Sequence, residues 1–348
     1  MSPSRCRFDV RRYQVVLVLV LCLAALAACA PATSTPAPGP KNLHFMGGYK
    51  PQANLPFVAA YVAQNQGFFA AQNLNVQISH SAGQGEHLKL TLQGSVDVTT
   101  GAADAVLGRR AEQLPVTAFA LFGQRGDIAY AVLESSDIRS PRDFEGRTVG
   151  FKVNPSPDYL ALLKSAGVNR SRVQEVPVGF DPRLLAAGRV DVYPVFESNE
   201  PYTLLSLGVP VRLIKASDYG VPGLGLTYIT RQQLLDDDPE MLERFLKATF
   251  RGIEYARANL ESATDIVMQF APNEDRSHQR AMLEVELSMA DGPVPAAHGF
   301  GWATREQWQA LHDSLLEFGG LKAAVDVDSV YSDRIVRTIY RNGQLIWP

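Results

Sequence analysis

Residues able to hold a small organic molecule gather in a few short loops of this 348-residue chain. Each loop follows an apolar segment and mixes glycines with amides, carboxylates and aromatic rings, as in the run from Tyr49 to Phe57. Glycines let the backbone approach a ligand, amides and acids hydrogen-bond to it, and rings cover its flat faces. The candidate site residues in these loops are Tyr49, Gln52, Asn54, Phe57, Gly83, Gln84, Gly85, Ala103, Asp104, Asn154, Ser156, Tyr159, Phe196, Glu197, Ser198, Asn199 and Glu200.

Recognised catalytic motifs are absent from the sequence: there is no Gly-x-Ser-x-Gly, no His-Glu-x-x-His and no P-loop. The six histidines are scattered, and the spacing of His80 and His87 across a glycine-rich loop is unlike that of zinc ligands. The acidic run 236–238 precedes a predicted helix, where it complements the helix dipole, and it lacks the pattern of a calcium-binding loop. We therefore expect a binding protein that is not an enzyme, with no metal and no cofactor.

The charge balance excludes several classes of partner. The chain has 33 Lys and Arg against 36 Asp and Glu, and removal of residues 1–28 would take away four arginines and one aspartate. A mature chain of this acidity has no basic field for nucleic acid and no cluster that would bind anionic lipid. Of the three cysteines only Cys29 would remain, which excludes an internal disulfide and a thiolate metal cluster.

The N-terminus has the pattern of an export signal. Four arginines precede the uncharged run 15–28, which has the length of a signal-peptide core. Leu26-Ala27-Ala28-Cys29 resembles the cleavage box of bacterial lipoproteins, in which the cysteine becomes the lipidated first residue. Residues 30–40 are small, uncharged and rich in proline, as in an extended tether. We expect a signal peptide at 1–28, a lipidated Cys29 with a tether to residue 40, and anchoring outside the cytoplasm; an ordinary signal peptide with a chance cysteine is the alternative.

An internal repeat organises the rest of the chain. Gly94-Ser-Val-Asp-Val98 recurs as Gly188-Arg-Val-Asp-Val192, and three further matches keep the same order at similar offsets. Each copy alternates short apolar segments with helical ones, which predicts parallel sheets with helices on both faces.

The repeat predicts two lobes with a cleft between them. We expect one lobe at 41–130 plus 229–348 and the other at 131–228, with helices at 241–260, 277–289, 305–318 and 329–341 packed on the first lobe. Two crossings, near 125–135 and 225–232, would form a hinge. Ligands of open α/β sheets bind beyond the carboxyl ends of the strands, which is where the candidate loops fall.

Several further stretches carry a family resemblance. They are Ala59-Ala60-Tyr61-Val62-Ala63, Gly67-Phe68-Phe69, Leu74-Asn75-Val76, Gly94-x-x-Asp97, Ile138 to Val149, Gly188-x-x-Asp191 and Asp218-Tyr219-Gly220. Over residues 41–348 the chain resembles the solute-binding proteins of bacterial ABC importers, in the branch that binds thiamin-pyrimidine precursors, riboflavin and alkylsulfonates. The resemblance implies the two-lobed type II periplasmic-binding-protein fold, each lobe a mainly parallel α/β sheet, and a monomer that delivers a small molecule to membrane permease subunits.

One departure bears on the ligand. Pyrimidine binders of this branch carry Trp-x-Pro-Asn-x-x-His after the first strand, whereas this chain reads Tyr49-Lys-Pro-Gln-Ala-Asn-Leu-Pro-Phe57. This stretch is closer to that of the riboflavin-binding members, and Glu197 to Pro201 resembles the Asn-Glu-Pro segment of vitamin binders. The acids Asp104, Glu197 and Glu200 argue against an anion and for a hydroxylated or amino-bearing ligand.

The ligand is therefore expected to be a flat heteroaromatic vitamin, riboflavin first and a thiamin-type pyrimidine second. Ring contacts are expected from Tyr49, Phe57, Tyr159, Phe196 and Tyr219, and ring-edge hydrogen bonds from Gln52, Asn54, Asn154 and Ser198. Two other classes stay open: an enzyme like the fungal pyrimidine synthase, whose cysteine-rich motif and histidines this chain lacks, and the ligand-binding domain of a membrane sensor.

Overall fold

The computed structural model describes residues 39–83 and 85–348. The expected signal peptide at 1–28, the lipidated Cys29 and all but the last two tether residues lie outside the described residues, as does Gln84. Residues Pro40–Pro348 form one compact unit. Its strands fall into two groups, which we call the first and the second lobe.

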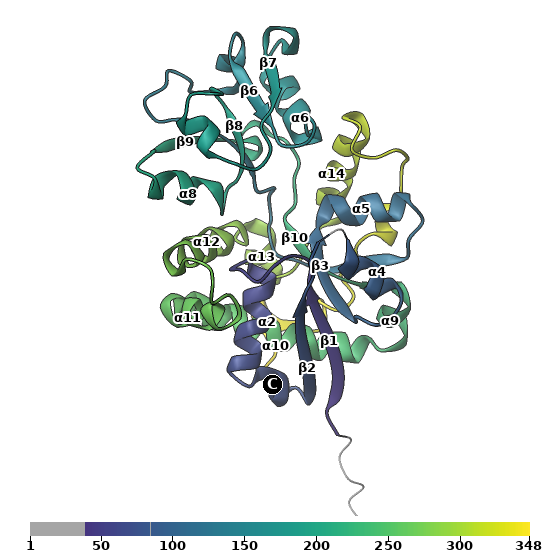
Figure 1. Cartoon of the computed structure of the whole chain (residues 1–348). Helices are drawn as coiled ribbons and strands as arrows, with labels where there is room; N and C mark the ends of the chain where they lie inside the picture. Colours follow the sequence, from purple (N-terminus) through teal and green to yellow (C-terminus); the bar gives the residue numbers. More distant parts are fainter. Residues whose placement is uncertain (1–38, 84) are drawn as a thin grey trace, which may run out of the picture. The chain divides into compact units, whose positions relative to one another are not determined.

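The first lobe is built on a five-stranded sheet with the order β2-β1-β3-β10-β4 (Figure 1). β1 is parallel to β2 and β3, whereas β10 is antiparallel to both of its neighbours, β3 and β4. All six residues of β4 are buried, as expected for a strand covered by helices on both faces. The strands are β1 (Lys41–Gly47), β2 (Leu74–His80), β3 (Val98–Ala102), β4 (Val116–Leu121) and β10 (Leu226–Arg231).

Helices cover both faces of this sheet (Figure 1). α2 and α10 pack so closely on one face that a Cβ atom added to Gly252 would lie 2.5 Å from the backbone oxygen of Ala59. On the other face, α5 and α14 bury Trp308 completely. The helices are α2 (Leu55–Asn65), α3 (Phe68–Ala71), α4 (Glu86–Leu92), α5 (Ala103–Ala111), α9 (Gln232–Asp237), α10 (Pro239–Ala258), α11 (Leu260–Phe270), α12 (Arg276–Met289), α13 (Pro293–His298) and α14 (Arg305–Glu317). No helix in the described part of the chain is long and apolar enough to cross a membrane.

The second lobe contains a three-stranded antiparallel sheet, β8-β5-β9, and the parallel pair β6-β7. A bridge between Val149 and Val192 joins the pair to the segment that leads into β8. The elements are β5 (Ile128–Leu133), β6 (Thr148–Phe151), β7 (Gln174–Pro177), β8 (Tyr193–Phe196), β9 (Val211–Lys215), α6 (Pro157–Ala166), α7 (Arg183–Ala186) and α8 (Glu200–Ser206), with 3₁₀ turns at Pro141–Phe144, Arg170–Arg172 and Ala216–Tyr219.

The two-lobed α/β fold is confirmed, but the sheets are mixed rather than mainly parallel. Most strands of each lobe end at the cleft. β5 and β10 are the first strands after the chain crosses from the other lobe, so they begin at the cleft. These two strands must therefore run against their neighbours. The expected lobe boundaries at 130/131 and 228/229 fall inside β5 and β10, each of which lies whole in one sheet.

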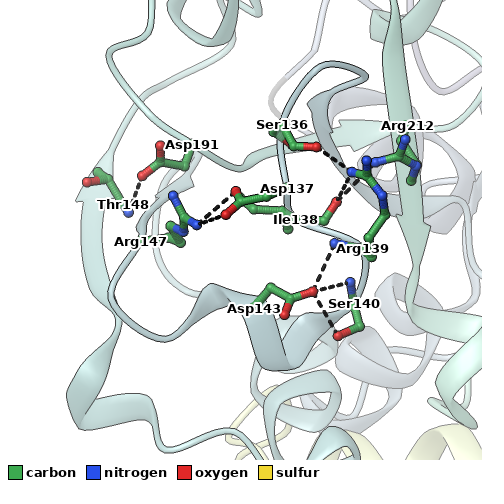
Figure 2. A network of polar contacts seen from close by, with 10 residues as sticks. All are labelled: Ser136, Asp137, Ile138, Arg139, Ser140, Asp143, Arg147, Thr148, Asp191 and Arg212. Carbon is green, nitrogen blue, oxygen red and sulfur yellow. Dashed lines mark hydrogen bonds and ion pairs between the residues drawn. The ribbon is translucent and has the colours of Figure 1, made fainter.

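The internal repeat has a structural counterpart in two aspartates. Asp97 accepts a hydrogen bond from the backbone N–H of His44 at 3.0 Å, and its own N–H donates to the His44 carbonyl. Asp191 makes the same two bonds with Thr148, the first at 2.8 Å (Figure 2). Each aspartate thus fastens the strand that follows it to a neighbouring parallel strand.

A polar network fixes the connection that leads into β6 (Figure 2). Asp143 accepts hydrogen bonds from the backbone N–H groups of Arg139 and Ser140, both at 2.9 Å, and Arg147 pairs with Asp137 at 2.7 Å. These contacts satisfy backbone groups at the start of the 3₁₀ turn Pro141–Phe144. They hold the connection against the start of β6.

The helix expected at 329–341 is not formed. This segment makes a 3₁₀ turn (Val327–Ser329), a loop of turns and a small hairpin of β11 (Tyr340–Arg341) and β12 (Gln344–Leu345). Asn342 and Gly343 both have positive φ, as the tight turn of a two-residue hairpin requires. The β-branched residues Ile335, Val336 and Ile339 are buried in the first-lobe core without helical geometry.

The two chain crossings touch through glycines. A Cβ atom on Gly225 would lie 2.7 Å from the Cα atom of Gly123, and one on Gly223 would lie 2.9 Å from the Cα atom of Gly126. The N–H of Gly225 also donates to the carbonyl of Gly123 at 2.9 Å. Side chains at these positions would force the crossings apart.

We predict that Gly225→Ala lowers the free energy of unfolding by about 1 to 3 kcal/mol, because the new methyl group meets backbone that has no rotamer to change. Denaturant unfolding of the purified protein measures the effect. Gly108→Ala is the matched control: a Cβ atom there meets nothing within 4 Å and the residue lies inside α5, so stability should be unchanged or higher. Equal stability of the two variants would contradict the close contact.

Candidate functional site

A cavity of about 690 Å³ is lined by residues of both lobes. This volume falls in the range typical of sites for small molecules and cofactors. The lining residues are Gly48, Tyr49, Gln52, Asn54, Phe57, His87, Thr100, Gly101, Ala102, Asp127, Phe180, Pro182, Phe196, Ser198, Asn199, Glu200, Thr203, Leu226 and Met282.

The first-lobe wall is the loop between β1 and α2. Gly48 begins it, and a Cβ atom there would lie 2.5 Å from the carbonyl oxygen of Thr100, so the close approach of loop and β3 requires glycine. The N–H of Gly48 donates to the hydroxyl of Thr100 at 2.9 Å. His80 bonds the carbonyl of Tyr49 at 2.7 Å and the hydroxyl of Tyr61 at 2.6 Å, which fixes the backbone that carries the exposed Tyr49 ring.

Helix α12 holds the end of the same loop through two side chains. Gln279 accepts from the N–H of Ala53 at 2.7 Å, and Glu286 accepts from the N–H of Leu55 at 3.1 Å. The other oxygen of Glu286 accepts from the amide of Asn54 at 3.0 Å and from the hydroxyl of Ser198 at 3.2 Å. Glu286 therefore contacts one cavity-lining side chain from each lobe.

Burial of Glu286 changes its acid–base behaviour. The carboxyl group is 5% exposed, and its burial, together with the charge of Asp127, raises its pKa to about 7, although the Leu55 and Asn54 hydrogen bonds favour the ionised form. The link between the two lobes at this point is thus titratable near neutral pH.

The second-lobe wall is the segment from Phe196 to Thr203. Glu200, at the first turn of α8, accepts from the N–H of Phe196 at 2.7 Å and pairs with Lys152 at 2.5 Å. The ammonium group of Lys152 also lies 4.0 Å from the centroid of the Phe196 ring, within cation–π range. This ion pair and the ring form one packed unit at the cavity wall.

Glu197 is turned away from the cavity, toward the crossings. Its carboxylate receives both terminal nitrogens of Arg125, at 2.6 and 2.7 Å, and the ammonium group of Lys215 at 3.0 Å. Burial by itself would raise the pKa of this carboxyl group, but the hydrogen bonds and charges of Arg125 and Lys215 together hold the pKa below its ordinary value. Glu197 therefore ties the first crossing to the end of β9.

Aromatic side chains face the cavity from both lobes. Tyr49 and Phe57 come from the first lobe, and Phe180 and Phe196 from the second. Tyr49 is 54% exposed and Phe180 67% exposed, which is unusual for rings of this size in a folded protein. Exposed rings on opposite walls suit a flat apolar ligand between them.

Eight predicted site residues line the cavity, namely Tyr49, Gln52, Asn54, Phe57, Phe196, Ser198, Asn199 and Glu200. Asn154, Ser156 and Tyr159 line instead a separate cavity of about 80 Å³ within the second lobe. Tyr219 packs against the second-lobe core, and Glu197 faces the crossings. Gly83, Gly85, Ala103 and Asp104 are not among the lining residues, and Gln84 is outside the described residues.

Phe180, Asp127 and His87 line the cavity but were not selected from the sequence. Phe180 follows β7, so the rule that ligands bind beyond the carboxyl ends of strands would have selected it. Asp127 precedes β5 and reaches the cavity because a crossing strand begins, rather than ends, at the cleft. His87 lines the cavity from the first turns of α4, and its Nδ1 has no hydrogen-bond partner among the described residues.

Metal chemistry has no counterpart in the described residues. No group of three or more His, Cys, Asp or Glu side chains among them is arranged to hold a metal ion. The cavity combines aromatic rings, amides and carboxylates, which are groups that can bind a small molecule by stacking and hydrogen bonds.

Comparison with known proteins gives a consistent result. A family model described as NMT1/THI5 like matches residues 54–263. The chain is 27% identical over 296 residues to riboflavin-binding protein RibY of Chloroflexus aurantiacus (81% of this chain, 83% of that protein). It is 26% identical over 270 residues to the formylaminopyrimidine-binding protein of Halalkalibacterium halodurans (73% and 81%).

A solved structure shows the fold. The periplasmic aliphatic sulphonate binding protein SsuA from Escherichia coli superposes with a TM-score of 0.64 at 15% identity, over 84% of this chain and 92% of that one. This likeness establishes the two-lobed fold of periplasmic binding proteins.

We predict that Glu286→Gln makes stability less dependent on pH. The unfolded carboxyl group loses its proton near 4.5 and the folded one at about 7, so the folded state retains a proton that the unfolded state has released. Stability should fall as pH rises between these values, by about 3 kcal/mol from this group.

Thermal unfolding across this pH range measures the effect. The Glu286→Gln profile should be flatter than that of the wild type, whereas Glu284→Gln, an exposed site on the same helix, should keep the wild-type slope. Parallel profiles for all three proteins would contradict the assignment.

Proposed function

The chain belongs to the NMT1/THI5-like family, and from this membership we propose that it is the extracytoplasmic solute-binding component of an ABC importer. The observation that carries the proposal is the cavity lined from both lobes, with exposed rings on opposite walls. A ligand that contacts both lobes favours the closed arrangement, because only differential affinity shifts such an equilibrium. Permease subunits would then receive the loaded protein.

The proposed ligand is a flat heteroaromatic vitamin, riboflavin first. Tyr49 and Phe180 offer ring faces from opposite lobes, and Gln52, Asn54 and Ser198 offer hydrogen-bonding groups between them. Glu200 and Asp127 can accept from ribityl hydroxyls. The name of the Chloroflexus relative supports this choice.

A thiamin-type pyrimidine is the second candidate. The name of the Halalkalibacterium relative favours it, and an exocyclic amine would also suit the cavity carboxylates. The ligand-binding domain of a membrane sensor would use the same cavity and lack a permease partner. We do not favour an enzyme, since the lining residues that the structure describes include neither a cysteine nor a second histidine beside His87.

We predict that riboflavin binds and that its fluorescence is quenched by stacking against the cavity rings. Phe180→Ala should weaken binding about tenfold, because it removes one ring face at little cost in stability. Tyr219→Ala, which removes a ring outside the cavity, should bind as the wild type does. Fluorescence titration measures all three, and an absorption spectrum of protein purified without added ligand shows any flavin that copurifies.

Two results would change the assignment. Binding of the aminopyrimidine by calorimetry, without quenching of riboflavin, would reverse the order of the two ligands. Loss of affinity in Tyr219→Ala but not in Phe180→Ala would place the site elsewhere.

We further propose that Cys29 is lipidated and anchors the protein. Membrane residence needs more than one acyl chain, as in a lipoprotein N-terminus. Cys29→Ser should move the protein to the soluble fraction after cell fractionation, whereas Cys6→Ser, in the segment expected to be cleaved, should not. A Cys29→Ser protein that stays membrane-bound would refute the anchor.

A further inference from the structure

Carboxylates dominate the charges around the cavity. Asp127 and Glu200 line it. Asp104 lies at the start of α5 in the first lobe, and Asp158 lies at the start of α6 in the second. The charge of Asp104 acts on both Asp127 and Asp158, so these acids interact across the two lobes. Asp104, Asp127 and Asp158 have no ion-pair partner among the described residues.

The titration behaviour of these acids agrees with their mutual proximity. Burial, with the charges of Asp104 and Glu200, raises the pKa of Asp127 to about 6. Burial, with the charges of Asp104 and Asp127, raises the pKa of Asp158 to about 7. Each carboxylate raises the free energy of the ionised form of its neighbours. The same repulsion would act on any further anion in the cavity.

Positive charge, in contrast, is already neutralised. No Lys or Arg is among the lining residues that the structure describes. Burial and the charge of Arg109 hold the pKa of His87 below its usual value, so this lining side chain is neutral at physiological pH. The neighbouring cations form pairs: Lys50 with Glu274 at 2.6 Å, Arg109 with Glu112 at 2.7 Å, Arg125 with Glu197 at 2.6 Å, Lys152 with Glu200 at 2.5 Å and Arg183 with Asp181 at 2.8 Å.

From these placements we propose that the cavity discriminates against phosphate esters: it takes the dephosphorylated vitamin and rejects its monophosphate. The inference rests on the proposed function and specifies the chemical form of the ligand. A phosphate in the cavity would meet Asp127 and the Glu200 carboxylate with no free cation to pair with, and burial of an unpaired anion is costly. A dephosphorylation reaction must therefore precede uptake whenever the vitamin is present as its phosphate.

Glu200 is the specificity-determining residue in this scheme. Its carboxylate pairs with Lys152, the cation directly behind the Phe196 ring, whose ammonium group is already largely buried. With the carboxylate removed, Lys152 has no ion-pair partner within the described residues and gives the cavity a cation.

Equilibrium titration of the full-length protein with riboflavin and with riboflavin 5′-phosphate tests the proposal, since the two share one ring system. Riboflavin should bind at least about tenfold more tightly at low salt, and the ratio should shrink as salt screens the repulsion. Glu200→Gln and Asp127→Asn should each lower the ratio several-fold toward equal affinity, whatever they do to riboflavin binding itself. Glu284→Gln, an exposed acid on α12, should leave the ratio unchanged.

The outcomes separate this inference from the proposed function. Equal affinity of the wild type for the two flavins, or a ratio unaffected in both cavity variants, overturns the inference and leaves riboflavin binding intact. If neither flavin binds, the same titrations are made with the aminopyrimidine and its monophosphate. The ratio of their two affinities then tests the inference in the same way. If no member of either pair binds, the proposed function fails and the inference with it.

Discussion

The chain passes between its two lobes twice, and the two passages lie against each other at Gly123 and Gly225. The contact leaves no room for a side chain at either position. β4 ends just before the first passage, and β10 begins just after the second. Residues at the carboxyl ends of β1, β3 and β8 line the cavity, which lies between the two lobes that these passages connect.

The two walls of the cavity are connected by side chains as well as by the crossings. Glu286 bonds Asn54 of one wall and Ser198 of the other, and Tyr202 stacks on His278 with ring centroids 4.9 Å apart. Glu197 joins the first crossing to β9 through Arg125 and Lys215. These contacts join the two lobes at their junction, whereas the exposed rings and Asp127 have no such partners among the described residues and are left for a ligand.

Much of the site followed from one rule applied to the sequence. Loops after apolar segments contain Asn54 and Ser198, because strand ends and the ligand space coincide in this fold. The rule failed where the chain direction reverses: Asp127 precedes its strand and was missed. Asn154 and Tyr159 follow the expected strand, yet the local path of the chain places them at a separate cavity of the second lobe. Such a path depends on contacts between distant residues, such as Asp191 with Thr148, which no local pattern encodes.

The position of β10 inside the first sheet has a consequence for the order of assembly. β3 and β4 are separated by this strand, which is made only after the whole second lobe. During synthesis, which starts at the N-terminus, the facing edges of β3 and β4 stay unpaired until residues 226–231 have been made. The second lobe, by contrast, is one continuous stretch and has all of its strands once β9 is complete. The second lobe therefore has all of its strands before the first lobe does, although the first lobe is begun earlier.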